Sequence, residues 1–72
     1  MQVKIRINSE RFEKILNDRL LYQEDVATTA GIAPVVISRM KNPKTHGSKG
    51  TAKKILKALP GVKFDDIFFV CD

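Results

Sequence analysis

Two short helical patterns separated by a single glycine most constrain the fold of this chain. The first begins near Gln23 and ends at Gly31, a residue type that adopts the left-handed backbone conformation at little cost. The second begins at Pro34, whose missing N–H and preset φ suit a first helical residue, and runs to about Lys41. Two helices joined by so short a connection predict a helix-turn-helix over about residues 23–42.

The second of these helices has two opposite faces. Its apolar residues recur at the spacing i, i+3, i+4, i+7, which is typical of a side that faces a core: Ala33, Val36, Ile37 and Met40. The opposite side has the same spacing but is mostly polar: Val35, Ser38, Arg39 and Asn42. Taken alone, that side is slightly better explained as ordinary solvated surface. Together with Pro34 it also suits the major groove of DNA, where Arg39 can bind guanine, Asn42 adenine and Val35 a thymine methyl group.

Charge is distributed unevenly along the chain. Thirteen Lys or Arg residues against eight Asp or Glu residues give a formal net charge of +5. Seven of the basic residues lie between Arg39 and Lys57, a segment without an acid. Basic faces are often only solvating, but one that adjoins a helix-turn-helix is the expected footprint of phosphate binding. We therefore expect an electrically two-sided molecule with its basic side next to the second helix.

The two ends of the chain have strand patterns. Val3, Ile5 and Ile7 alternate with charged residues, which predicts a strand with one buried face. The apolar run from Ile67 to Val70 is its best antiparallel partner, within the chain or across a dimer, and the alternative for this run is a terminal helical turn. A small sheet is therefore expected, and its pairing is open between one chain and two.

Three further segments have helical spacing. The first is expected to begin with Ser9 as its cap and to bury an apolar stripe: Phe12, Ile15, Leu16 and Leu20. The others are expected from about Thr51 to Leu59 and from Phe64 to Phe68. The chain is thus predicted to be one compact, mainly α domain over residues 1–72, with four to five helices and short terminal strands that pair.

Residue counts exclude several classes of function. One cysteine, Cys71, and one histidine, His46, are too few for an internal disulfide or a four-ligand zinc site, and we expect no metal and no cofactor. Asp65 and Asp66 diverge if they lie on a helix, so they are not an acid–base pair, and no catalytic residue is assigned.

No stretch approaches the roughly 20 apolar residues of a membrane span, and the N-terminus lacks a signal-peptide pattern. We expect a cytoplasmic protein that is not an enzyme and does not bind a membrane.

Several of these residues together resemble the lambda-repressor-like family of Cro/CI-type (XRE-family) helix-turn-helix DNA-binding proteins of phages and bacteria. The shared pattern is a Gln that opens the first helix, an Ala four residues on, a Gly at the turn, and an Ile followed by Ser on the second helix: Gln23, Ala27, Gly31, Ile37 and Ser38. The resemblance covers about residues 12–67. It implies a five-helix domain in which Gln23 contacts the phosphate backbone and the exposed face of the second helix reads the major groove.

The chain departs from that family pattern in places. Tyr22 and Ala33 stand where the family usually has capping hydroxyl residues, so both helix starts are expected to lack a side-chain cap. The loop from Asn42 to Gly50 is longer and more basic than usual, and we expect it to order on binding as a phosphate clamp. The candidate phosphate-binding residues are Gln23, Lys41, Lys44, Thr45, Ser48 and Lys49.

These features predict a sequence-specific double-stranded DNA-binding transcriptional regulator of the repressor or Cro type that occludes a promoter. One small module makes few base contacts, so a homodimer is expected to place two recognition helices about 34 Å apart on a DNA operator. A chain of 72 residues has no room for an effector domain, so no small-molecule effector is expected. The alternative is a small protein-interaction module, antitoxin-like or an antirepressor, that uses the same fold to bind a protein partner.

Overall fold

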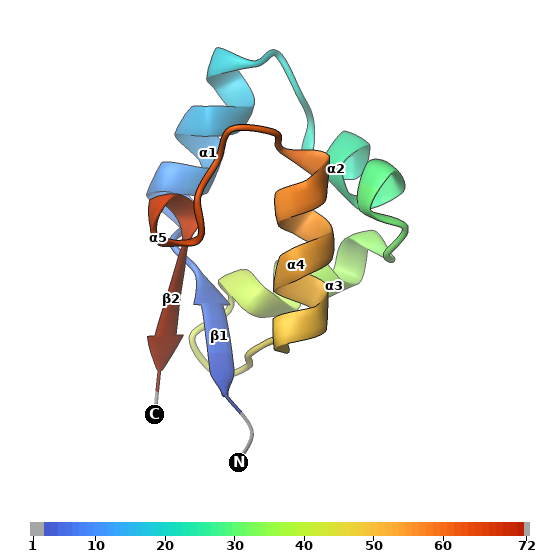
Figure 1. Ribbon diagram of the computed structural model, residues 1–72. Helices are drawn as coiled ribbons and strands as arrows, with labels where there is room; N and C mark the ends of the chain where they lie inside the picture. The colour runs from blue at the N-terminus through green and yellow to red at the C-terminus, as the bar shows by residue number, and fades with distance from the viewer. Residues whose placement is uncertain (1–2, 72) are drawn as a thin grey trace.

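Five helices and two strands make up the structure, a computed structural model that describes residues 3–71 (Figure 1). In chain order the elements are β1 (Lys4–Ile7), α1 (Ser9–Asp18), α2 (Gln23–Ala30), α3 (Pro34–Lys41), α4 (Lys49–Ala58), α5 (Phe64–Ile67) and β2 (Phe68–Cys71). The predicted small, mainly α domain with short terminal strands is confirmed.

The two ends of the chain pair with each other. β1 and β2 form an antiparallel two-stranded sheet in which Ile5 lies opposite Val70 and Ile7 lies opposite Phe68. Ile5, Ile7 and Phe68 are buried because they share the face of the sheet that packs on the helices. The strands therefore pair within one chain, which decides between the two pairings that the sequence allows.

A single apolar core joins the sheet to the helices. Each helix and β1 contributes at least one large, fully buried side chain: Ile7, Phe12, Val26, Ile37, Met40, Ile55, Leu59 and Ile67. Within residues 3–71 no polar or charged residue is buried. A chain of this length needs nearly all of its apolar side chains for one core, and the buried set accordingly draws on almost every element.

The limits of α1 differ from those expected. Its cap is Asn8, whose side-chain oxygen accepts a hydrogen bond from the N–H of Arg11 at 3.2 Å, and Ser9 is the first helical residue. The helix ends at Asp18, so Leu20 lies beyond it, with a φ of 57° and a side chain that is 90% exposed. The prediction that Leu20 joins the core stripe is wrong, because the chain leaves the helix before reaching it.

The residues before α2 and α3 give these helices no side-chain cap, as predicted, whereas α4 begins earlier than expected. Within α2, Asp25 accepts a hydrogen bond from the backbone N–H of Tyr22 at 2.7 Å, which satisfies that N–H from inside the helix. Ser48 accepts from the N–H of Thr51 at 3.3 Å, and α4 begins at Lys49 rather than near Thr51. Caps of this kind typically stabilise a helix by about 1 kcal/mol, which favours the earlier start of α4.

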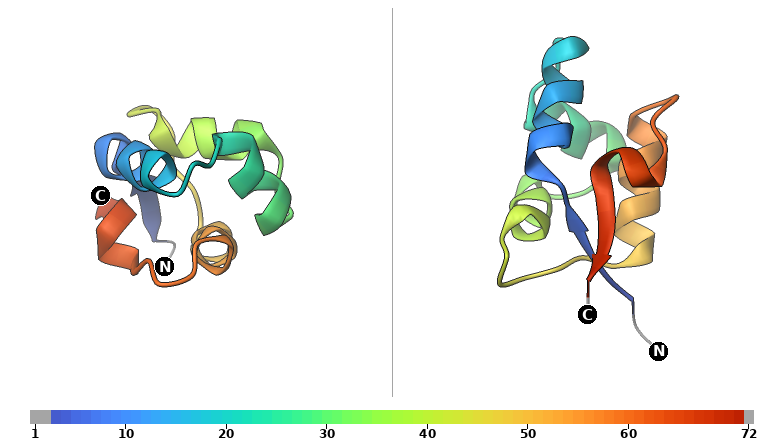
Figure 2. Two further views of the ribbon diagram at one scale, coloured as in Figure 1. Left: turned by 90° about the horizontal axis from the view of Figure 1, so that it is seen from above. Right: turned by 90° about the vertical axis from the view of Figure 1, so that its left-hand side faces the viewer.

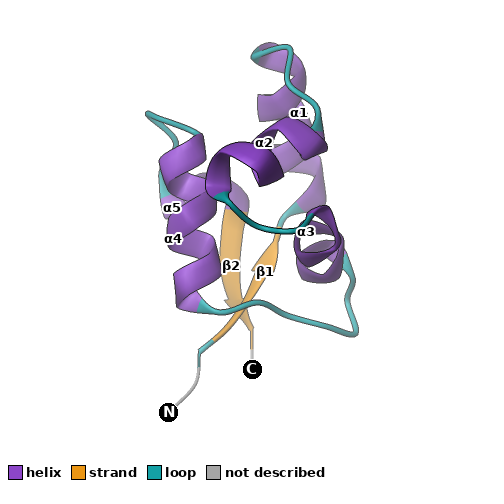
Figure 3. Ribbon diagram, turned by 90° about the vertical axis from the view of Figure 1, so that its right-hand side faces the viewer, coloured by secondary structure: helices purple, strands orange, loops and turns teal. Residues whose placement is uncertain are grey.

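α3 and α4 lie on opposite sides of the molecule. The view from above in Figure 2 shows them at opposite edges, and Figure 3 shows α4 and α3 on either side of the sheet and α2. α2 packs against both of them. The two helices that carry most of the basic segment between Arg39 and Lys57 therefore lie on different sides of the molecule.

Candidate nucleic-acid interface

The connection between α2 and α3 is a tightly hydrogen-bonded helix end. Gly31 has φ 73° and ψ 34°, the left-handed conformation predicted for it. Its N–H donates to the carbonyl of Thr28 at 3.2 Å, and the N–H of Ile32 donates to the carbonyl of Ala27 at 3.0 Å, which is the Schellman pattern. Pro34 then starts α3. The two helices form a helix-turn-helix whose turn is fixed by backbone bonds.

α3 has one buried face and one exposed face. Ile37 and Met40 are buried and Val36 is half-buried. Ala33 is exposed, and the prediction that it faces the core is wrong, because the helix begins only after it. All of the predicted base-reading residues are exposed: Pro34, Val35, Ser38, Arg39 and Asn42. The exposed side of α3 therefore has the composition that the sequence predicts.

Side chains from three helices meet at the edge of this face. Gln23, the first residue of α2, donates from Nε2 to the hydroxyl of Ser38 at 3.2 Å, and its Oε1 accepts from Lys41 Nζ at 3.3 Å. Lys41 Nζ also lies 2.6 Å from Oε1 of Glu13 on α1, in the single ion pair among the described residues. We call these four residues the Gln23 network. It brings together three predicted site residues and adds Glu13, which no sequence pattern distinguishes from other exposed acids.

Hydrogen bonds also hold the start of the loop after α3. The Oδ1 atom of Asn42 accepts from the N–H of Lys44 at 2.9 Å. The hydroxyl of Thr45 donates to the carbonyl oxygen of Arg39. The side chains of Asn42 and Thr45 thus have structural partners at the end of α3, whereas Lys44 is exposed and its ammonium group is free of such partners in the described chain.

Gly47 joins this loop to the sheet. Its N–H donates to the carbonyl of Ile5 at 2.8 Å, and the N–H of Ile5 donates back to Gly47 at 3.2 Å. A Cβ atom at Gly47 would lie 2.6 Å from the sulfur of buried Met40, so any larger residue would force Met40 to shift within the core. The loop is therefore joined to β1 at Gly47, and its ordering on binding stays a prediction.

The last two predicted phosphate-binding residues lie at the start of α4. Ser48 uses its side-chain oxygen to cap that helix. Lys49, in the first turn, lines an apolar groove between α4 and the sheet. Neither residue belongs to the Gln23 network.

The basic segment is divided between two sides of the molecule. Three of its residues belong to α3 and the loop that follows: Arg39, Lys41 and Lys44. Three others are exposed along α4: Lys53, Lys54 and Lys57. Because α3 and α4 lie on opposite sides (Figure 3), the expectation of one basic side is wrong. Basic residues that follow one another in the sequence therefore lie on two different sides of the molecule.

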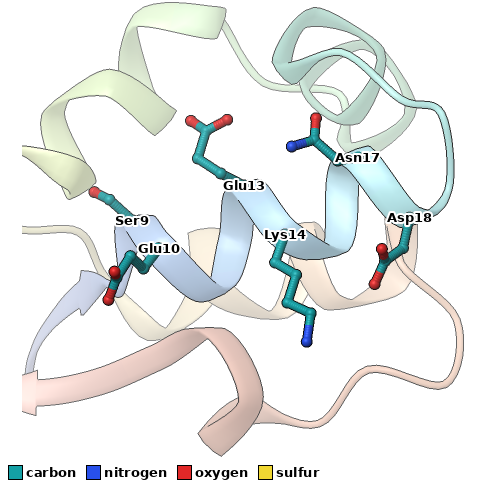
Figure 4. A pocket seen from close by; sticks show the side chains of 6 residues that line it. All are labelled: Ser9, Glu10, Glu13, Lys14, Asn17 and Asp18. Atoms are coloured by element: carbon teal, nitrogen blue, oxygen red, sulfur yellow. The ribbon is translucent and has the colours of Figure 1, made fainter.

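A shallow pocket runs along α1, and Figure 4 shows its lining: Ser9, Glu10, Glu13, Lys14, Asn17 and Asp18. Glu13 points away from Lys14 and Asp18 in this view, so the carboxylates do not converge. In residues 3–71 no group of three or more His, Cys, Asp or Glu residues is placed to hold a metal ion. No helix in the same part of the chain is long and apolar enough to cross a membrane.

Comparison with known protein families, with curated proteins and with solved structures gives no match to this chain. Its most distinctive features are the helix-turn-helix, the exposed face of α3 and the Gln23 network beside it.

Proposed function

We propose that this chain is a sequence-specific double-stranded DNA-binding transcriptional regulator of the repressor or Cro type, which places α3 in the major groove. One observation carries the proposal. The exposed side of α3 presents Val35, Ser38, Arg39 and Asn42, while its other side is buried in the core. The major groove admits an α-helix, and helix-turn-helix proteins insert their second helix in this way.

The exposed residues of α3 have side chains that suit base edges. Arg39 can donate two hydrogen bonds to O6 and N7 of guanine. Pro34 and Val35, at the start of the helix, suit a thymine methyl group. The oxygen of Asn42 is occupied within the loop, so its NH₂ group remains for an acceptor on adenine or on the backbone. Few polar groups read bases, and we infer that specificity depends on Arg39 and on the shape of the DNA.

Phosphate contacts are proposed for the residues around this face. Gln23 and Lys41 orient each other, and each retains at least one N–H for a phosphate oxygen after the bonds described above. Lys44 adds an exposed positive charge at the end of α3. Thr45 already donates its hydroxyl hydrogen to a carbonyl oxygen, so its contact with phosphate requires that bond to break. We therefore expect Gln23, Lys41 and Lys44 to contribute most.

The proposed regulator acts in the cytoplasm as a homodimer and needs no small-molecule effector. Two copies related by a twofold axis would place their α3 helices about 34 Å apart on one face of the duplex. Binding of this kind excludes polymerase from an overlapping promoter. Sedimentation with and without a duplex that holds two half-sites measures the stoichiometry.

Two substitutions on the DNA-binding face test the proposal. Arg39→Ala should weaken binding to the preferred duplex by roughly 1–3 kcal/mol and relax specificity at one position. Lys44→Ala should weaken binding to all duplexes alike and reduce the salt slope by about one unit. Fluorescence anisotropy with a preferred and an unrelated duplex, over a range of salt concentrations, separates the two effects.

A protein-interaction module would respond differently. In an antitoxin-like or antirepressor role, both substitutions would leave function nearly intact, and Phe69→Ser on the sheet would abolish it. Phe69 is 39% exposed, so that substitution removes surface rather than core. Unchanged DNA affinity in both the Arg39 and Lys44 variants would contradict the proposed function.

A further inference from the structure

A stripe of cations runs along the outer side of α4. Lys49, Lys53 and Lys57 recur every four residues, so they lie along one side of the helix over about 12 Å, and Lys54 lies beside them. All four side chains are exposed, whereas the apolar residues of the helix are buried or half-buried. We call these four residues the α4 lysine stripe.

The positive charge of the stripe is not offset within residues 3–71. The single ion pair in that part of the chain joins Lys41 of α3 to Glu13 of α1, and α4 itself contains no acid. Like charges one turn apart destabilise a helix, and the positive end of the helix dipole disfavours a cation at Lys49. The first turns of α1, α2 and α5, by contrast, hold acids. An anionic partner would therefore remove repulsion that α4 carries in the free protein.

The composition of the stripe favours phosphate groups over a protein partner. The centres of protein–protein interfaces are enriched in aromatic residues and depleted in Lys. The exposed side of α4 consists of the four lysines and Gly50, without an aromatic residue. Lysine binds phosphate as a point charge with no fixed geometry, which suits contacts with a nucleic-acid backbone that do not depend on sequence.

A lipid surface fits the stripe less well than a nucleic acid does. A helix that lies on a membrane inserts an apolar face between the lipids. The apolar face of α4 is already used within the protein, because Ala52 and Ile55 belong to the core. No apolar side chain of α4 is exposed. The helix therefore offers a lipid surface charge without an apolar face to insert.

A second copy of the chain offers fewer negative charges than the stripe needs. Within residues 3–71 adjacent acids occur only at 24–25 and 65–66, and in each pair the second carboxylate accepts a hydrogen bond at the start of its own helix. On α1, Glu13 is paired, and Glu10 and Asp18 are eight residues apart, or about 12 Å. Duplex DNA carries one negative charge per roughly 1.7 Å of its axis, which matches a continuous stripe.

We propose that the α4 lysine stripe binds the phosphate backbone of duplex DNA without regard to sequence. Because α3 and α4 lie on different sides of the molecule (Figure 3), a duplex bound at α4 is a different segment from one that α3 reads. The chain then joins two segments of DNA. Binding at α4 does not depend on the proposed function, whereas the joining of two segments rests on it.

The first experiment measures binding at α4 by itself. Arg39→Glu with Lys44→Glu, the α3 variant, reverses the charges of the face proposed for α3. Its binding to a fluorescein-labelled duplex of arbitrary sequence is measured by anisotropy over a range of salt concentrations. Adding Lys53→Gln and Lys57→Gln, the α4 substitutions, should weaken the remaining binding by roughly tenfold to hundredfold at low salt and reduce the salt slope by about two units.

A matched control removes the same net charge from other elements. Lys14→Gln on α1 with Lys63→Gln before α5 changes two exposed lysines outside the stripe. In the α3 variant this pair should weaken binding by less than about twofold. Circular dichroism and a thermal melt show that each variant keeps the fold. Equal effects of the control pair and of the α4 substitutions would overturn the inference.

The second experiment measures whether two duplexes are joined. Beads that carry one duplex should retain a second, fluorescent duplex when the wild-type chain is added, and the α3 variant should retain little. The α4 substitutions in the wild-type chain should also abolish retention while the first duplex stays bound through α3. Retention by that α4 variant equal to the wild type would overturn the proposed joining.

The same variants separate the possible partners. If the α3 variant binds DNA as tightly as the wild type while the α4 substitutions abolish binding, the proposed function fails and the site at α4 stands. Tighter binding of the wild-type chain to vesicles of phosphatidylcholine and phosphatidylserine than to DNA, lost with the α4 substitutions, would overturn the inference in favour of a membrane. A dimer without DNA in sedimentation equilibrium that the α4 substitutions dissociate would overturn it in favour of a second copy.

Discussion

The side-chain amide of Gln23 donates a hydrogen bond to the hydroxyl of Ser38 at 3.2 Å, which ties the first residue of α2 to the exposed face of α3. The oxygen of the same amide accepts a hydrogen bond from Lys41 Nζ, so both the nitrogen and the oxygen of the Gln23 side chain have partners. Residues proposed to contact phosphate are therefore coupled to a residue proposed to contact a base. In the proposed complex with DNA, this coupling would hold the Gln23 and Ser38 side chains in place and so lower the entropy lost on binding.

Gln23→Ala should weaken DNA binding more than it weakens the fold. The bonds of Gln23 are largely exposed, so the free energy of unfolding should fall by only about 0.5–1 kcal/mol. Affinity should fall for all duplexes, because a phosphate contact is lost and Ser38 is freed. A double-mutant cycle with Ser38→Ala, measured by anisotropy, should give a coupling of about 0.5–1 kcal/mol. Fully additive effects would show that the contact has no part in DNA binding.

Glu13→Gln should strengthen DNA binding. The carboxylate of Glu13 pairs with Lys41 and adds a negative charge beside the face proposed to meet phosphates. Both side chains are partly exposed, so loss of the pair should change stability by less than about 1 kcal/mol. We expect affinity to rise by roughly twofold to fivefold at low salt and by less at high salt. Glu10→Gln on the same helix is the control, and weaker binding by the Glu13 variant would contradict the placement of Lys41 at the interface.

Replacing Gly47, before α4, and Gly50, in its first turn, with alanine should change stability in opposite directions. Gly47→Ala places a Cβ 2.6 Å from the Met40 sulfur and should destabilise the domain by about 1–3 kcal/mol through overpacking. Gly50→Ala, in the first turn of α4, meets only the Ser48 hydroxyl at 3.9 Å and should stabilise by up to about 1 kcal/mol. Urea denaturation of both variants measures the difference. Equal stability of the two would contradict the bridge between the loop and the sheet.

Leu20→Gly should stabilise the protein, although it removes a large apolar side chain. Leu20 has φ 57° and is 90% exposed, so it contributes strain and little burial. Glycine removes the strain of a left-handed backbone but gains conformational entropy in the unfolded chain. The net increase in the free energy of unfolding should be about 0.5–1 kcal/mol. Leu16→Ala, from the buried side of α1, should instead cost about 2–5 kcal/mol. A lower melting temperature for Leu20→Gly would contradict the observed end of α1.

Features that depend on neighbouring residues were predictable from the sequence. The turn at Gly31, the start of α3 at Pro34 and the exposed face of that helix follow from backbone preferences and from helical spacing. The sequence does not decide the start of a helix where two adjacent residues are equally good caps. Asn8 and Ser9 are both good cap residues, and the sequence predicts a cap at Ser9, whereas Asn8 is the cap in the structure.

Features that depend on residues far apart in the chain were not predictable. Ile5 is equally buried whether its strand pairs within one chain or across a dimer, so periodicity could not choose between them. The close approach to Gly47 comes from Met40 and Ile5, which the fold brings to it. The pairing of Glu13 with Lys41 and the separation of α3 from α4 have the same origin. Helical spacing shows which side of a helix is buried, but it does not show where that helix lies relative to another.

Selection from a random duplex library at about physiological salt, followed by sequencing, tests the central claim most directly. Phosphate-driven affinity alone enriches no sequence, so enrichment measures specificity. The proposed homodimer predicts an enriched inverted repeat whose half-site centres are about 10 base pairs apart, and Arg39→Ala should lose one preferred position in each half-site. A library that remains random after selection would contradict the assignment of α3 as a recognition helix.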